Sequence, residues 1–176
     1  MAGRFDRRDT RRTALGGVLA AGSLAVLWLA CIAPTGSLGV TAVAGLFPMV
    51  AVVTSGRPAG FLCWAASAVL GLLLLPDKGV ALLYFCFLGL YPVVKSHLEH
   101  LPGRVLEWVC KLVYFNLALT LVWFVFRALF LPMLPSWLEA QTWLIYVVGN
   151  VVFVAYDIGL SQLIGALTRR LYPGRR

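Results

Sequence analysis

Charge is what this sequence has least of. Only 12% of its 176 residues are Asp, Glu, Lys or Arg, whereas 61% are hydrophobic. Ordinary globular domains have roughly 25% charged residues. A soluble domain of this size could not bury so much apolar side chain, because a large share of its accessible surface still faces water. The scarcity of charge argues against a soluble protein and predicts an all-α, polytopic membrane helix bundle.

Long linkers, low-complexity tracts and a clear internal repeat are also missing from the sequence. A single integral membrane domain is therefore expected over residues 1–176. Within it we expect a basic cytoplasmic segment at 1–13, a helix bundle at 14–171 and a basic cytoplasmic tail at 172–176.

Six apolar stretches come close to the roughly 20 residues that a helix needs to cross the hydrocarbon. They cover Ala14–Ile32, Leu38–Thr54, Ala59–Leu75, Val80–Val94, Val105–Leu131 and Thr142–Leu167. The second and fourth stretches are short, so a tilted or partly re-entrant segment is an alternative at these two places.

Basic residues are distributed unevenly between the two sides that these spans define. If both termini are cytoplasmic, the outer side keeps Lys78 and Arg127. The inner side collects the other thirteen: Arg4, Arg7, Arg8, Arg11, Arg12, Arg57, Lys95, Arg104, Lys111, Arg169, Arg170, Arg175 and Arg176. Lys and Arg favour the cytoplasmic side of short loops, which predicts both termini inside a bacterial cytoplasmic membrane. The anionic inner leaflet then accounts for the net charge of +8, and no nucleic-acid partner is expected.

Patterns for metal, redox or catalytic chemistry are missing too. The histidines His97 and His100 have no third ligand nearby, so neither a metal nor a cofactor is expected. A membrane enzyme that uses Asp157 with Lys95 or Lys111 is an alternative, but no paired-carboxylate, Ser/His or metal pattern supports it. We therefore expect no catalytic residue. Four cysteines lie singly within the spans and are expected to be small buried apolar residues: Cys31, Cys63, Cys86 and Cys110.

A group of charged residues lies in or beside the apolar helices of the second half: Lys95, Glu99, Glu107, Lys111 and Asp157. Lys95/Glu99 and Glu107/Lys111 are spaced to pair along one helix face. A structural clamp at the inner interface is one interpretation of these four residues, and a functional role is the other. Asp157 needs a partner at its depth, because a lone charge in hydrocarbon is costly. We therefore predict a contact between Lys111 and Asp157, completed by Glu107.

Polar side chains also follow one face of each of the last two spans. Asn116, Thr120, Trp123 and Arg127 lie on the fifth span, and Tyr146 and Asn150 lie on the sixth. The short connection between the two spans predicts that they are neighbours. These residues are candidates for a substrate-binding pocket, and hydrogen bonding between the helices without a ligand is the equal alternative.

Small residues recur every four positions in the first span, at Gly17, Ala21 and Ala25. Such a face lets another helix approach closely. The partner is either a helix of this protein or a helix of another one.

Together these features resemble the substrate-binding S component of energy-coupling-factor (ECF) transporters. The resemblance rests on the length, the six helices, the basic N-terminus before a small-residue first helix, and "GNVVFVAYDIGLSQLIGALTRRL" as a sixth helix. The chain also resembles small bacterial membrane proteins that carry "PDK…LLYF…GLYPVVK…LE" followed by "EWVCKLVYFN".

The resemblance implies uptake of a vitamin-like small molecule, bound in a pocket near the outer face and lined by the outer parts of the last three helices. It also implies docking of Gly17, Ala21 and Ala25 on a transmembrane T component that works with ATPase subunits. Two features depart from the family pattern. "APTGSLG" is short for a loop that closes over a substrate, and the charge group near Lys111 is not expected. The rival interpretation is a scaffold for cell-envelope morphogenesis of the MreD type, without transport.

Overall fold

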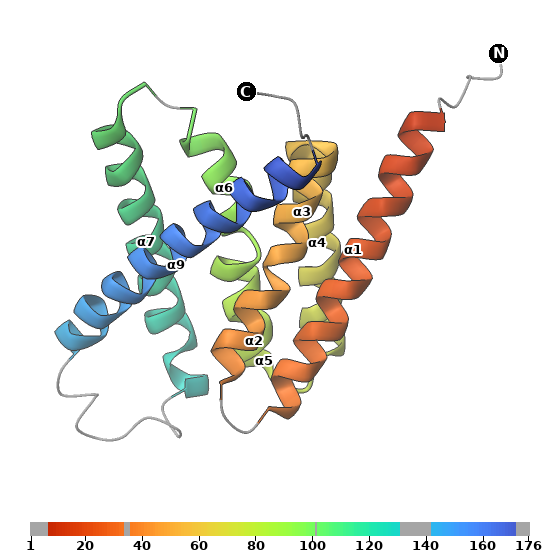
Figure 1. The fold of residues 1–176 in the computed structure, drawn as a ribbon. Coiled ribbons are helices and arrows are strands. Elements are labelled where there is room, and N and C mark those ends of the chain that lie inside the picture. Colours follow the sequence, from red (N-terminus) through yellow and green to blue (C-terminus); the bar gives the residue numbers. More distant parts are fainter. Residues whose placement is uncertain (1–6, 34–35, 101, 131–141, 172–176) are drawn as a thin grey trace, which may run out of the picture. The chain divides into compact units, whose positions relative to one another are not determined.

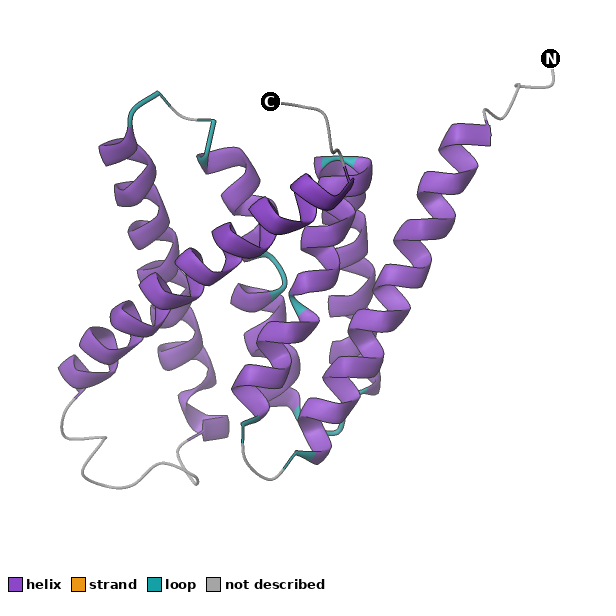
Figure 2. Cartoon of the chain, viewed as in Figure 1, coloured by secondary structure: helices purple, strands orange, loops and turns teal. Residues whose placement is uncertain are grey.

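The computed structural model describes residues 7–33, 36–100, 102–130 and 142–171, and it places side chains at 13–33, 36–100, 102–123 and 143–170. Every regular element in these ranges is a helix (Figure 2). The chain divides into two compact units, Met1–His97 and Leu98–Arg176.

Six helical segments in the described ranges are long and apolar enough to cross a membrane. They cover Thr13–Ile32, Ser37–Ser55, Arg57–Leu74, Lys78–Leu98, Arg104–Trp123 and Trp143–Arg170. The all-α class and the number of candidate spans are thereby confirmed, and they support a multi-pass membrane protein. The side of the membrane on which each terminus lies stays a prediction.

The first unit contains the first four spans (Figure 1). Its first helix, α1 (Arg7–Ile32), begins before the predicted span at Ala14. Residues 7–13, part of the predicted basic segment, are therefore helical. No Gly or Pro interrupts these residues, and Arg is a good helix former.

The second span is divided into α2 (Ser37–Ala44) and α3 (Leu46–Ser55). Pro48 has no N–H, so it cannot donate to the carbonyl of Ala44 four residues earlier. The hydroxyl of Ser23 in α1 donates to that carbonyl instead, over 3.0 Å. A side chain from the first helix thus satisfies a backbone group that the proline leaves open.

The fourth span is divided as well, into α5 (Lys78–Leu83), the π-helical turn η1 (Tyr84–Leu88) and α6 (Tyr91–Leu98). The N–H of Gly89 bonds the carbonyl of Tyr84, five residues earlier, at 2.9 Å. Pro92 offers no N–H to the carbonyl of Leu88. The two spans that look short in the sequence have 19 and 21 residues, and both are interrupted.

The two interruptions meet inside the first unit. A Cβ atom at Gly45, between α2 and α3, would collide with the carbonyl oxygen of Leu88 in η1. Glycine is therefore required here for close approach of the two backbones.

The third span, α4 (Arg57–Leu74), packs on α1 and α3. At Gly60 a Cβ would collide with the side chain of Val52, which shows how closely α3 and α4 approach. The indole N–H of Trp64 donates to the carbonyl of Phe85 at 3.2 Å and ties α4 to η1. The buried core of this unit contains Leu27, Ala30, Ala44, Trp64, Ala68, Leu75, Val80, Ala81 and Tyr84.

The turn between the third and fourth spans caps both helices. Asp77 accepts hydrogen bonds from the N–H groups of Gly79 and Val80, at 2.8 and 3.3 Å. These two bonds satisfy backbone N–H groups in the first turn of α5, which have no partner within the helix. Lys78 Nζ donates to the carbonyls of Leu72 and Leu75, at 2.8 and 2.9 Å, at the end of α4. Lys78, one of two basic residues assigned to the outer side, thus has a local structural role.

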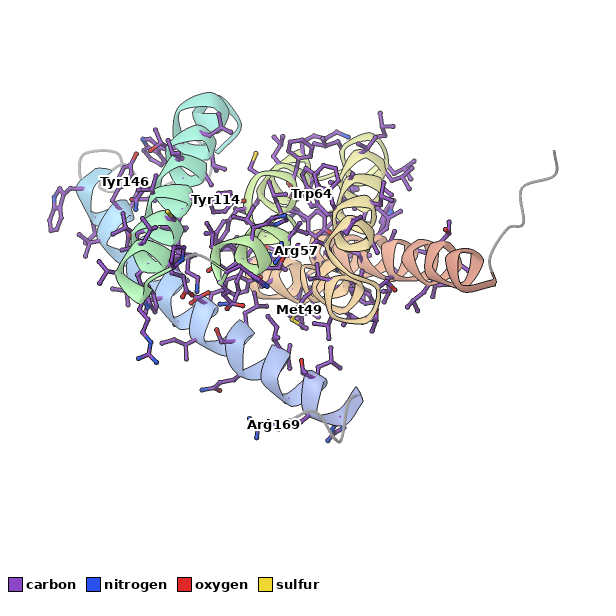
Figure 3. The ribbon with its side chains drawn as sticks, turned by 90° about the horizontal axis from the view of Figure 1, so that it is seen from above. Met49, Arg57, Trp64, Tyr114, Tyr146 and Arg169 are labelled. Carbon is purple, nitrogen blue, oxygen red and sulfur yellow. The ribbon has the colours of Figure 1, made fainter. Side chains whose placement is uncertain are left out.

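The second unit contains α7 (Arg104–Phe130) and α9 (Thr142–Leu171), which pack against each other. The rings of Phe115 and Phe153 stack between them, with centroids 4.6 Å apart. A Cβ at Gly149 would lie 3.3 Å from both Leu119 and Phe115, so the helices are close at this level. Figure 3 shows Tyr146 and Arg169 toward opposite ends of α9.

Candidate functional site

The charge group of the second unit centres on Lys111 of α7. Its Nζ lies 2.6 Å from Glu107, 3.3 Å from Asp157 of α9 and 3.9 Å from Glu99. It also lies 5.4 Å from the centre of the Trp108 ring, within cation–π distance. The side chains of Lys111 and Asp157 are each 3% exposed. The predicted contact of Lys111 with Asp157 and Glu107 is present.

This geometry explains how an aspartate can lie within an apolar helix. Burying a charge is tolerable when it is paired and hydrogen-bonded, and Lys111 donates directly to Asp157. Glu107 and Glu99 are more exposed, at 22% and 38%, as expected of residues nearer the helix ends. The fifth member of the predicted group, Lys95, lies outside this unit, on α6, where its side chain is fully buried.

A polar seam continues from this group along α7 and α9. Asn116 and Asn150 exchange hydrogen bonds between their amides, at 3.1 and 3.2 Å. One turn further, the hydroxyls of Thr120 and Tyr146 are 2.9 Å apart. The structure therefore brings four of the six predicted pocket residues together. The other two are Trp123, which is half-buried on α7, and Arg127, whose side chain lies outside the described residues.

The hydrogen bonds in the seam use the donors of both amides. Asn116 Nδ2 donates to the carbonyl of Leu112 as well as to Asn150. Asn150 Nδ2 donates to the carbonyl of Tyr146 as well as to Asn116. An amide nitrogen has two N–H groups. This arrangement is what hydrogen bonding between the helices requires, and a ligand would have to replace some of these bonds.

A second polar cluster, in the first unit, was missed by the sequence analysis. The hydroxyl of Tyr84 lies 2.8 Å from Ser23 Oγ and 2.8 Å from Ser67 Oγ, and all three residues are fully buried. Ser23 donates to the carbonyl of Ala44, so its hydroxyl group links Tyr84 to that carbonyl. The hydroxyl chain therefore ends on the carbonyl that Pro48 leaves open, at the level where the interrupted spans meet.

The signal for this cluster in the sequence is weak. A serine within a helix can bond a carbonyl of its own preceding turn, as Ser67 does with Cys63 at 2.8 Å. Two isolated serines and a tyrosine on three different spans therefore did not predict a shared site.

The small residues of α1 lie on the outside of the first unit. Gly17, Ala21 and Ala25 are all exposed. A different face of the helix is buried in the unit, formed by Ala20, Ser23, Leu27 and Ala30. The helices of the first unit therefore do not pack against this small-residue face.

Metal binding has no geometric support in the described residues. Among them no group of three or more His, Cys, Asp or Glu side chains could hold a metal ion. His97 Nδ1 lies 3.0 Å from the carbonyl of Val93 in its own helix, as a hydrogen-bonded interfacial histidine does.

Comparisons of the chain with protein-family models, curated proteins and solved structures found no match. The geometry described above therefore carries the functional argument.

Proposed function

We propose that the chain is the S component of an uptake transporter of the ECF type, without enzymatic activity. In this proposal it lies in the bacterial cytoplasmic membrane with both termini inside. The observation that carries the proposal is the exposed face of Gly17, Ala21 and Ala25 on α1. Small residues at a helix surface favour close packing of a second membrane helix. The partner would be a transmembrane T component that works with ATPase subunits.

The interrupted spans support transport as well. Many transporters bind substrates or ions where discontinuous helices meet in the bilayer. Here α2 and α3 meet η1 at Gly45 and Leu88, with the hydroxyl chain of Ser23, Ser67 and Tyr84 beside them.

The substrate would be a small vitamin-like molecule. The polar seam at Asn116, Thr120, Tyr146 and Asn150 remains the candidate binding surface, with Trp123 and Arg127 toward the predicted outer side. Mass spectrometry of small molecules retained by the gently purified protein tests this part of the proposal directly.

The docking face is tested by substituting Ala21→Trp. Trp adds bulk at an exposed position, so it should block approach of the partner helix while the unit stays folded. Copurification with the T component and ATPase subunits should be lost, together with uptake. Leu73→Trp on α4 is the matched control, because Leu73 is also exposed but lies outside α1. A complex that survives Ala21→Trp would contradict the proposal.

The rival function is a membrane scaffold for cell-envelope morphogenesis. The self-contained hydrogen bonds of Asn116 and Asn150 favour it, since they need no ligand. Copurification separates the two functions: ATPase partners support uptake, whereas cytoskeletal or peptidoglycan-synthesis partners support the scaffold.

A further inference from the structure

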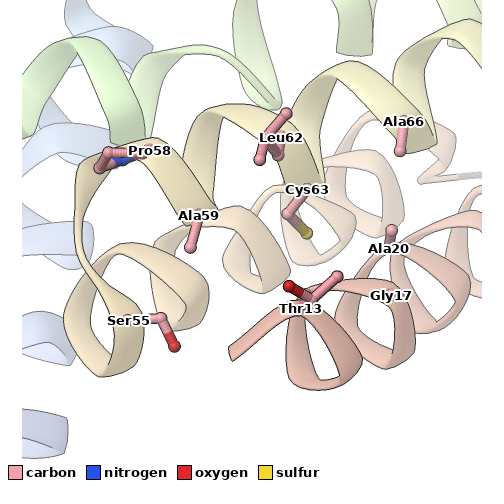
Figure 4. Close-up of a pocket in the computed structure, with 10 residues that line it drawn as sticks. Thr13, Gly17, Ala20, Ser55, Pro58, Ala59, Leu62, Cys63 and Ala66 are labelled. Carbon is pink, nitrogen blue, oxygen red and sulfur yellow. The ribbon is translucent and has the colours of Figure 1, made fainter. Parts of the chain in front are cut away.

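We draw no further inference here: the strongest candidate, the groove between α1, the end of α3 and the first half of α4 (Figure 4), is lined by uncharged residues such as Ala20, Leu62 and Cys63, and nothing in the structure shows what covers it.

Discussion

At the scale of single residues, the pair of Lys111 and Asp157 shows how one contact permits a charge at membrane depth. Both side chains are almost fully buried, and the pair joins α7 to α9. Removing Lys111 leaves Asp157 as an uncompensated buried charge, and that loss outweighs the value of the ion pair itself. Removing Asp157 leaves Lys111 paired with Glu107 at 2.6 Å. The contribution of the contact to stability is therefore seen by comparing the two single variants with the double variant.

We expect Lys111→Met to destabilise the protein by about 3–5 kcal/mol, and Asp157→Leu to destabilise it by less, because Glu107 still pairs with Lys111. The double variant should lose less than the sum of the two, because neither charge is then stranded. Thermal unfolding in detergent measures this cycle. Arg169→Met is the control, since Arg169 is an exposed cation on α9 and its loss should change stability by less than about 0.5 kcal/mol. Strictly additive single changes would show that the contact does not form.

At the scale of helices, hydropathy and side-chain periodicity predicted the six spans and the polar seam. Polar side chains such as Asn116 and Asn150 need partners inside a membrane, and their positions on two neighbouring helices leave few choices. The interruptions could not be predicted in the same way. Pro48 and Gly45 lie inside an apolar stretch. Hydropathy does not show where a backbone carbonyl lacks its intrahelical hydrogen bond, nor which side chain replaces it.

Gly45 provides a test of the crossing between the interrupted helices. Gly45→Ala places a methyl group against the carbonyl of Leu88, and backbone on both sides leaves little room to adjust. We expect a loss of about 1–3 kcal/mol, the usual cost of overpacking. In Gly39→Ala on α2 the new methyl group meets open space, so this variant should be neutral or slightly stabilising. Equal melting temperatures for the two variants would argue against the crossing.

At the scale of the whole molecule, the orientation in the membrane follows from the distribution of basic residues. Single cysteines at Lys78, Arg57 and Arg104, in a variant without native cysteines, can be labelled on intact cells with an impermeant reagent. We expect labelling at position 78 alone, and at positions 57 and 104 only after the membrane is permeabilised. Labelling of position 57 in intact cells would reverse the predicted topology.

The π-helical turn at Tyr84–Leu88 has a consequence for how the chain tolerates changes in its length. The hydrogen bond from Gly89 to Tyr84 spans five residues, one more than in an α-helix. Deleting Cys86 would leave the N–H of Gly89 and the carbonyl of Tyr84 four residues apart. The turn can then become ordinary α-helix, and the side chains before and after it keep their orientation relative to each other. Deleting Val69 from the regular helix α4 would instead rotate all later positions by about 100°. We expect the protein lacking Cys86 to accumulate in the membrane and the one lacking Val69 to be degraded, which immunoblotting of membrane fractions measures. If evolution has shortened or lengthened this span by a single codon, the π-helical turn is where that change would have been absorbed.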